Sequence, residues 1–293
     1  MKIHLDCFPC FLRQVVIALR MGEVDEALHE RPSEGLPRAF DVIKAALPEM
    51  ERADFSKSPA HATTFIHRKI REVIGADPFR KIKSEYNKKA LSLYPELERE
   101  IKKSADPLFT AARLAVAGNV IDFGIFTSID IGGTVKKALD AEIAVDDYAP
   151  FKRKIEESRD ILYLLDNAGE IVFDRLLIEI LSSMGKKVTA VVKGAPVIND
   201  ATREDAFEVG LNGRCELIDN GSDCVGTILP MTSPEFRERF ETAALIISKG
   251  QGNFETLMLE KKENVFFLFQ AKCGVVSRML ALPQGAMLLK RHE

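Results

Sequence analysis

Asp166 and Asn167 are the polar pair in this chain whose types and position most directly suggest chemistry. They follow an apolar run at residues 161–165 that is typical of a fully buried strand. Apolar residues at helical spacing come next, over residues 171–184, and Gly185 ends that pattern. A carboxylate and an amide are therefore expected at the carboxyl end of a parallel strand, where open α/β sheets bind ligands. The alternative is that one of the two only caps the helix, since Asp and Asn are preferred N-cap residues.

Asp200 is the second carboxylate predicted at this edge of the sheet. It lies in the loop that follows another apolar run, at residues 188–192. If the two strands are neighbours, Asp200 can face Asp166 and Asn167, and the two carboxylates then need a cation or a shared proton. Oxygen ligands without His or Cys favour Mg²⁺ or Mn²⁺ over Zn²⁺, with water in the remaining positions. The pattern predicts a divalent-metal site that could hold a substrate phosphate.

Lys249 is the positive charge predicted to complete this site. It precedes Gly250 and Asn253, in a segment that could turn backbone N–H groups toward an anion at the start of a helix. A lysine, a metal and a helix N-terminus together could stabilise a phosphoryl group in transfer. We predict that Lys193, Lys249, Gly250 and Asn253 contact the substrate; the alternative for a strand-end lysine is a solvated side chain.

The elements that position these residues are predicted to form a Rossmann-like α/β domain over residues 151–293. Five buried runs, separated by helices or loops, indicate a doubly wound parallel sheet with helices on both faces. These runs cover residues 161–165, 188–192, 215–218, 243–247 and 265–269. Residues 1–150 are mostly helical in pattern and repeatedly broken by Pro or Gly, which predicts an irregular multi-helical domain.

Asn119 and Asp122 follow a helix rich in small residues that begins at Pro107 and ends at Gly118. Polar groups at a packed helix end need partners, because burying them unpaired costs about 1–3 kcal/mol or more. Two interpretations stay open. Asn119 and Asp122 could bond the local backbone, or they could project into a cleft between the two halves and contact the substrate.

Composition limits the classes of partner. The chain has 293 residues and a net charge of -3, which gives no reason to expect nucleic acid or an acidic membrane. No apolar run approaches the roughly 20 residues of a membrane span, and the start lacks a signal-peptide core, so a cytoplasmic location is predicted. Five cysteines argue against a disulfide framework. Cys7 and Cys10 could form a redox or metal pair, or they could be buried and inert.

The chain resembles the damage-control phosphatases, a family long described as a domain of unknown function. The resemblance spans essentially the whole chain and looks closest to the stand-alone prokaryotic branch, which carries the N-terminal Cys-x-x-Cys. Its motifs are Cys7-Phe8-Pro9-Cys10, Gly118-Asn119-Val120-Ile121-Asp122, Asp166-Asn167-Ala168-Gly169-Glu170, Lys193-Gly194 through Asn199-Asp200, and Ser248-Lys249-Gly250-Gln251-Gly252-Asn253.

This resemblance implies a fold, a site and an activity. The implied fold is a helical domain on a Rossmann-like domain. The implied metal ligands are Asp166, Asn167 and Asp200, and the implied phosphate-contacting lysine is Lys249. The implied reaction is hydrolysis of small phosphate esters, including sugar phosphates and damaged phosphometabolites. Mg²⁺ or Mn²⁺ is expected, and Co²⁺ or Ni²⁺ could replace it.

Two mechanisms and two other functions stay open from the sequence. A metal-held water oriented by Asp166 or Asp200 could attack phosphorus, or Asp166 could form an aspartyl-phosphate. The chain could instead be an S-adenosylmethionine-dependent carboxyl methyltransferase, although no Gly-x-Gly loop follows the first predicted strand. It could also bind a phosphorylated metabolite without turning it over.

Overall fold

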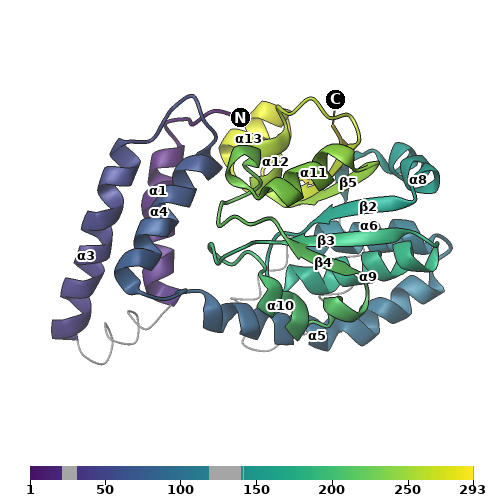
Figure 1. Cartoon of the computed structure of the whole chain (residues 1–293), viewed down its shortest axis with the longest axis horizontal. Helices are drawn as coiled ribbons and strands as arrows, with labels where there is room; N and C mark the ends of the chain where they lie inside the picture. The colour runs from purple at the N-terminus through teal and green to yellow at the C-terminus, as the bar shows by residue number, and fades with distance from the viewer. Residues whose placement is uncertain (22–31, 119–139, 141, 293) are drawn as a thin grey trace.

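The computed structural model describes residues 1–21, 32–118, 140 and 142–292. Asn119 and Asp122 lie outside these described residues, so their two interpretations stay open. The described chain forms an α/β body and, beside it, a group of three long helices (Figure 1). Among the described residues, no helix is both long enough and apolar enough to cross a bilayer.

One sheet organises the α/β body, and its described strands run in the order β1-β7-β6-β5-β2-β3-β4. Each of the neighbouring pairs from β6 to β4 is parallel, whereas β7 is antiparallel to β6 and β1 is parallel to β7. The strands are β1 (Ile143–Asp146), β2 (Asp160–Leu164), β3 (Lys187–Val192), β4 (Glu216–Asp219), β5 (Leu245–Lys249), β6 (Val265–Gln270) and β7 (Met287–Arg291).

The five predicted strands are confirmed as β2 to β6, and two strands, the edge strand β1 and its neighbour β7, were missed. The parallel register places Asp160 opposite Lys187 and Ile161 opposite Leu245, so β2 lies between β3 and β5. β1 was not predicted because it is only four residues long and alternates between half-buried and exposed positions. β7 was missed because three apolar residues followed by two cations do not resemble a buried run.

Helices cover both faces of the sheet, as predicted. One face packs against α5 (Arg80–Lys103), α6 (Pro107–Gly118), α8 (Tyr148–Glu157) and α9 (Glu170–Ser183). The other face packs against α11 (Pro234–Thr242), α12 (Gln251–Leu257) and α13 (Gly274–Leu280). The loop between β3 and β4 carries a short helix, α10 (Arg203–Glu208), and a 3-10 turn at Leu211–Gly213; a second 3-10 turn, Leu229–Met231, precedes α11.

The small residues of α6 serve close packing between helices. A Cβ atom added to Gly118 would lie 2.9 Å from Cγ of Phe173 on α9, which is too close for a carbon atom. Ala111, Ala112 and Ala115 are fully buried in the same core. The helix therefore belongs to the α/β body.

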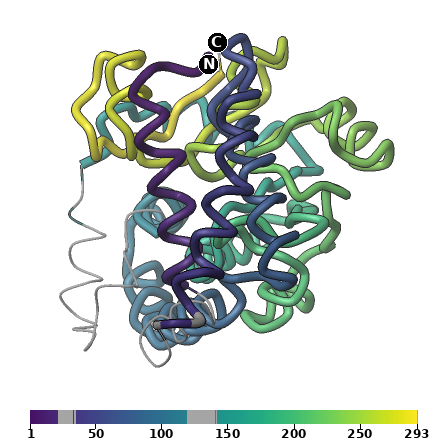
Figure 2. Tube along the Cα trace, turned by 90° about the vertical axis from the view of Figure 1, so that its left-hand side faces the viewer, coloured from purple at the N-terminus to yellow at the C-terminus, as the bar shows by residue number. Residues whose placement is uncertain are grey.

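A separate core holds α1 (Cys7–Met21), α3 (Pro32–Glu51) and α4 (Pro59–Ile74) together. These three helices run alongside one another at one end of the molecule (Figure 2). The helical half predicted for residues 1–150 thus divides differently in space. Its first three described helices form their own cluster, whereas α5, α6 and β1 join the sheet and its covering helices.

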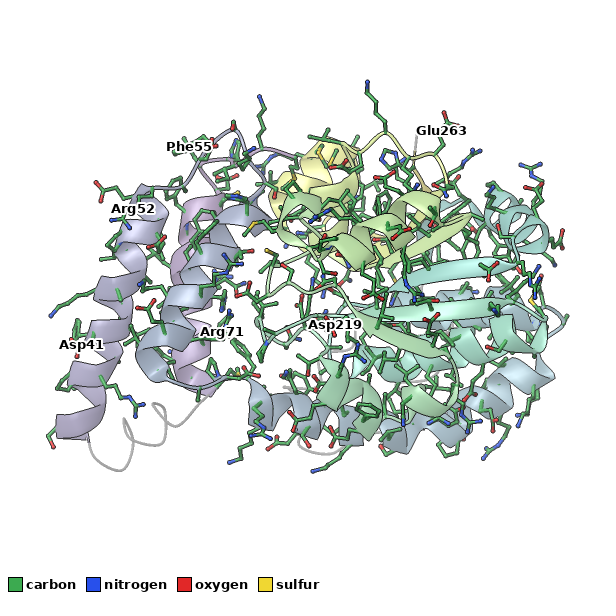
Figure 3. The ribbon with its side chains drawn as sticks, viewed as in Figure 1. Asp41, Arg52, Phe55, Arg71, Asp219 and Glu263 are labelled. Atoms are coloured by element: carbon green, nitrogen blue, oxygen red, sulfur yellow. The ribbon has the colours of Figure 1, made fainter. Side chains whose placement is uncertain are left out.

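Arginines on α4 connect this cluster to the α/β body. Arg68 Nε lies 2.9 Å from both carboxylate oxygens of Asp223, and Arg71 binds the same carboxylate. Figure 3 labels Arg71 on α4 beside the loop that carries Asp223. Val225 N–H donates to Thr64 Oγ1 at 3.0 Å. The loop after β4 is thus held by a charged and a neutral contact to α4.

Candidate active site

Two chain corners at the carboxyl edge of the sheet bring the predicted oxygen donors together. Ala201 N–H donates to the backbone oxygen of Asp166 at 2.7 Å, and Ala168 N–H donates to that of Asn199 at 2.9 Å. Asn167 and Asp200 face each other as an antiparallel backbone bridge. The turn after β2 and the loop after β3 are therefore joined by their backbones, as expected if these strands are neighbours.

The loop that carries Asp200 is held in an unusual conformation. Ile198, two residues earlier, has a φ of 45°, which is rare for a β-branched residue. Such strain costs about 1–3 kcal/mol and persists only where the surroundings enforce it. Asp200 N–H donates to the Val197 oxygen at 3.0 Å, which closes the turn. This conformation is unfavourable for the backbone of Ile198, and it brings Asp200 opposite Asn167.

Asp166 and Asp200 are both buried, with 9% and 4% of their surfaces exposed. Burial, followed by the charges of Glu170 and Asp200, raises the pKa of Asp166 well above its usual value. Burial also raises the pKa of Asp200, although the positive charge of Lys193 opposes this rise. Water does not stabilise these carboxylates as it would on the surface, so a positive charge or a proton must do so.

Asn167 links the cluster to helix α9. Its amide N–H₂ donates to Asp166 Oδ2 at 2.6 Å and to Glu170 Oε2 at 3.1 Å. The amide oxygen takes part in neither of these bonds. Asn167 therefore holds two acidic side chains in place and leaves its oxygen for another partner.

The donor set fits a hard divalent cation. Asp200 Oδ2 is buried and lies 3.3 Å from Lys193 Nζ, yet it accepts no hydrogen bond of good geometry. Within the described chain, no three His, Cys, Asp or Glu side chains are grouped as metal ligands. A cation here would be held by two carboxylates, the Asn167 amide oxygen and water, the incomplete protein coordination that Mg²⁺ commonly accepts.

Lys193 lies beside Asp200 and is itself buried. Its ammonium group contacts Asp200 and donates to the backbone oxygen of Gly226. The predicted site lysine is thus fixed between the loops that follow β3 and β4. Its contact with a substrate stays a prediction.

Lys249 is the residue whose surroundings differ most from expectation. It is 0% exposed, and its ammonium donates to Glu170 Oε1 at 2.5 Å and to Asp174 Oδ1 at 2.7 Å. Burial alone would lower the pKa of Lys249, but these two carboxylates outweigh it and raise the pKa. Contact of Lys249 with phosphate therefore stays a prediction. The observed arrangement links Lys249 to Asn167 through the carboxylate of Glu170.

Asp174 closes this buried network on its inner side. Tyr163 Oη donates to Asp174 Oδ1 at 2.8 Å. Burial raises the pKa of Asp174 to about 7, even though Lys249 acts in the opposite direction. Since two carboxylates share one ammonium group, protonation of Asp174 would balance the charge of the network.

Gly250 and Asn253 also help to position the site. Asn253 is buried; its amide donates to the Lys249 backbone oxygen at 2.8 Å and accepts from Thr227 Oγ1 at 2.8 Å. Gly250 has a φ of 81° and donates its N–H to the Leu268 oxygen at 3.1 Å. Substrate contact by either residue stays a prediction.

The Gly250→Ala variant should lose most activity, because an added Cβ would lie 2.0 Å from Asp166 Oδ2. Displacement of that carboxylate by about 1 Å is expected to lower kcat by about a hundredfold. Gly75→Ala is the matched control: its φ is 79°, and an added Cβ meets nothing within 4 Å. Both variants should lose stability in thermal melts because both positions have positive φ, and Gly250→Ala should lose more because of its clash; only Gly250→Ala should lose activity. Equal activity in the two variants would show that activity does not depend on the position of the Asp166 carboxylate.

Several residues that support the site were not predicted. Asn87 Oδ1 on α5 accepts the Gly169 N–H at 2.7 Å, and the Asn87 amide donates to Asp205 Oδ1 at 3.2 Å. Lys83, also buried on α5, donates to Asp205 Oδ2 at 3.2 Å. Nothing in the sequence pairs these distant segments. Glu170 and Asp174 did carry a signal, because carboxylates four residues apart on a buried helix face require a cation.

Cys7 and Cys10 lie on α1 with free thiols, Cys7 buried and Cys10 exposed. Burial raises the pKa of the Cys7 thiol, and partial desolvation by the surrounding protein raises that of Cys10, which disfavours the reactive thiolate. A redox or metal role for the pair stays a prediction.

The fold is that of an α/β protein with an open, largely parallel sheet, a class that commonly binds its ligands at the carboxyl ends of the strands. The chain belongs to the damage-control phosphatase family: the family model for the damage-control phosphatase ARMT1-like domain matches residues 3–288. The resemblance drawn from the sequence motifs is confirmed.

Relatives align with the chain over nearly its whole length. It is 36% identical over 301 residues to the uncharacterized protein MJ0202 of Methanocaldococcus jannaschii, covering 99% of this chain and 96% of that protein. It is 33% identical over 296 residues to the damage-control phosphatase PH1575 of Pyrococcus horikoshii, covering 100% and 99%. The crystal structure of PH1575, described as a DUF89 family protein, superposes with a TM-score of 0.87 at 32% identity and covers 100% of both chains.

Proposed function

We propose that this protein is a divalent-metal-dependent phosphatase that hydrolyses small phosphate esters. The observation that carries the proposal is the meeting of Asp166, Asn167 and Asp200, which two backbone-joined corners bring to one edge of the sheet. Membership of the damage-control phosphatase family supports a phosphatase. So does the name of the relative PH1575.

The cation would be Mg²⁺ or Mn²⁺, held by Asp166, Asn167 and Asp200. When bound, it would supply the positive charge that polarises a phosphate oxygen and that offsets the two carboxylates. Co²⁺ and Ni²⁺ could use the same oxygen ligands.

The chain's own residues would supply the remaining chemistry. Asp166 or Asp200 would orient the attacking water and accept its proton. In the rival route, an Asp166 oxygen attacks phosphorus, the alcohol leaves, and water then hydrolyses the aspartyl-phosphate. Lys193, next to Asp200, would add positive charge near the phosphate. Glu170 would keep Asn167 oriented through the bond between them.

The proposed substrates are small phosphorylated metabolites, namely sugar phosphates or damaged phosphometabolites. The test is release of inorganic phosphate from a panel of such esters, with each of Mg²⁺, Mn²⁺, Co²⁺ and Ni²⁺. We expect release that EDTA abolishes and excess metal restores. Release that is insensitive to EDTA would contradict the metal dependence. Binding of esters without phosphate release would instead indicate a non-catalytic binding protein. Methyl transfer from S-adenosylmethionine would indicate a methyltransferase.

A further inference from the structure

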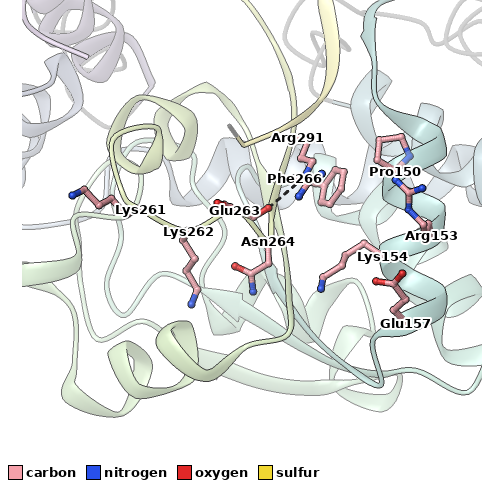
Figure 4. A pocket seen from close by; sticks show the side chains of 10 residues that line it. All are labelled: Pro150, Arg153, Lys154, Glu157, Lys261, Lys262, Glu263, Asn264, Phe266 and Arg291. Carbon is pink, nitrogen blue, oxygen red and sulfur yellow. Dashed lines mark hydrogen bonds between the residues drawn. The ribbon is translucent and has the colours of Figure 1, made fainter.

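We propose a second binding site, at the amino ends of the parallel strands, for a small polyanion that carries more than one phosphate group. The site is a cavity of about 450 Å³ between α8, the loop that precedes β6 and the end of β7 (Figure 4). Glu263 and Asn264, which line it, come just before the first residue of β6. The cavity therefore lies at the amino ends of the parallel strands, whereas Asp166 and Asp200 follow their carboxyl ends. The inference does not depend on phosphatase activity.

The lining of this cavity is strongly basic in a chain that is acidic overall. Five cationic and two anionic side chains line it, so its formal charge is 5 − 2 = +3, against -3 for the whole chain. A concave surface of one charge sign concentrates ions of the opposite sign. The cations are Arg153, Lys154, Lys261, Lys262 and Arg291, and the acids are Glu157 and Glu263.

Most of these cations have no side-chain partner in the described part of the chain. Among the described residues, the side chains of Arg153, Lys154 and Lys261 take part in no hydrogen bond or ion pair. Arg291 Nε has only a 3.5 Å contact with the backbone oxygen of Glu263. Lys262 differs, because its ammonium donates to the backbone oxygen of Glu241 at 2.7 Å. Within the described structure, three cations around this opening therefore have no protein partner, and the fourth, Arg291, has only a neutral one.

The two carboxylates of the lining do not neutralise this charge. Glu157 lies one helical turn after Lys154 on α8, yet the two form no ion pair in the described structure. Lys154 instead extends from α8 toward Asn264, across the opening (Figure 4). Like charges that share a concave surface raise one another's energy, and a bound anion would relieve this.

The chemistry of the lining favours a polyphosphate over a single phosphate. Arginine binds phosphate oxygens through two parallel N–H groups, and lysine adds a compact point charge. The cations come from three separate segments, namely α8, the loop before β6 and the end of β7, so one phosphate could not neutralise all of them. The volume lies within the range of about 300–1,000 Å³ that is typical of small-molecule sites.

The test is calorimetric titration of the whole protein with inorganic tripolyphosphate, at low ionic strength and with EDTA present. Wild type should bind, and the double variant Lys154→Glu with Arg291→Glu should bind at least about tenfold more weakly. Lys154→Gln with Lys261→Gln, which keeps Arg291 and its strand intact, should also bind more weakly. The matched control is Lys44→Glu with Lys88→Glu, two exposed lysines on α3 and α5, and it should bind like wild type.

Three results would overturn the proposal: no binding to wild type, equal loss in the Lys44 and Lys88 control, or unchanged binding in both cavity variants. Asp166→Asn separates the two sites. If tripolyphosphate binding is lost in Asp166→Asn and kept in the cavity variants, the ligand belongs to the candidate active site and the second site does not exist. Tripolyphosphate binding tests the second site, and release of inorganic phosphate tests the proposed phosphatase. Either proposal can therefore fail without the other.

Discussion

Asp166→Asn is expected to lower metal-dependent phosphate release by at least about a hundredfold. The substitution keeps the shape of the side chain, so packing against Gly250 is retained, but it removes one of the two proposed negative oxygen ligands. The loss should appear in kcat/KM for every ester that wild type hydrolyses, because the proposed role of the missing group is at phosphorus rather than at the leaving group. The measurement is phosphate release at saturating metal concentration.

The same variant should be more stable than wild type when no metal is present. Burial raises the pKa of Asp166 in the folded state above its unfolded value. A group with a raised pKa stabilises the fold at pH values below its unfolded pKa, near 3.8, and loses that contribution as the pH rises through the folded pKa. At neutral pH an ionised Asp166 therefore opposes folding, and a neutral Asn removes this penalty. Urea denaturation in EDTA should show a higher midpoint for Asp166→Asn.

Asp219→Asn is the matched control for both measurements. Asp219 also ends a parallel strand at this edge of the sheet, but its carboxylate pairs with Arg203 Nε at 2.7 Å, outside the cluster. We expect this variant to keep near-normal activity and to gain no stability. Near-normal activity in Asp166→Asn would remove the proposed catalytic centre. An inactive Asp166→Asn that is also less stable would point to a structural role instead.

Burial explains why the central part of the fold could be predicted from sequence. β2, β3, β5 and β6 are covered on both faces, so they appear as continuous apolar runs that need no knowledge of their neighbours. β1 and β7 lie toward one edge, where the apolar pattern is mixed, and their assignment depends on pairing with each other. Local sequence does not encode such pairing.

The same distinction applies to the site. Asp166, Asn167 and Asp200 converge because turns after neighbouring parallel strands share an edge, a consequence of topology that sequence pattern can anticipate. The direction of the Lys249 side chain could not be anticipated in this way. Successive residues of a strand point to opposite faces, and the face chosen here places Lys249 against α9. Contacts from Lys83 and Asn87 join segments more than 80 residues apart in the chain and leave no local signal.

Lys249→Met should be among the most destabilising single substitutions in this chain. It removes the ammonium group that donates to both Glu170 and Asp174, and it leaves both carboxylates buried. Breaking a buried ion pair by removing one partner costs about 3–5 kcal/mol. Urea denaturation should show this loss at neutral pH, and Lys88→Met, on the exposed face of α5, should show almost none.

The pH dependence separates loss of charge from loss of packing. Asp174 already has a folded pKa of about 7 against an ordinary value of 3.8, and loss of the Lys249 ammonium would raise it further. A raised folded pKa gives stability that is complete below about 3.8 and is lost as the pH climbs through the folded value. The deficit of Lys249→Met should therefore shrink as the pH falls from 7 toward 4, and adding Asp174→Asn should recover part of it at neutral pH. A deficit that is the same at all pH values, and that Asp174→Asn does not reduce, would mean that Lys249 contributes through packing alone.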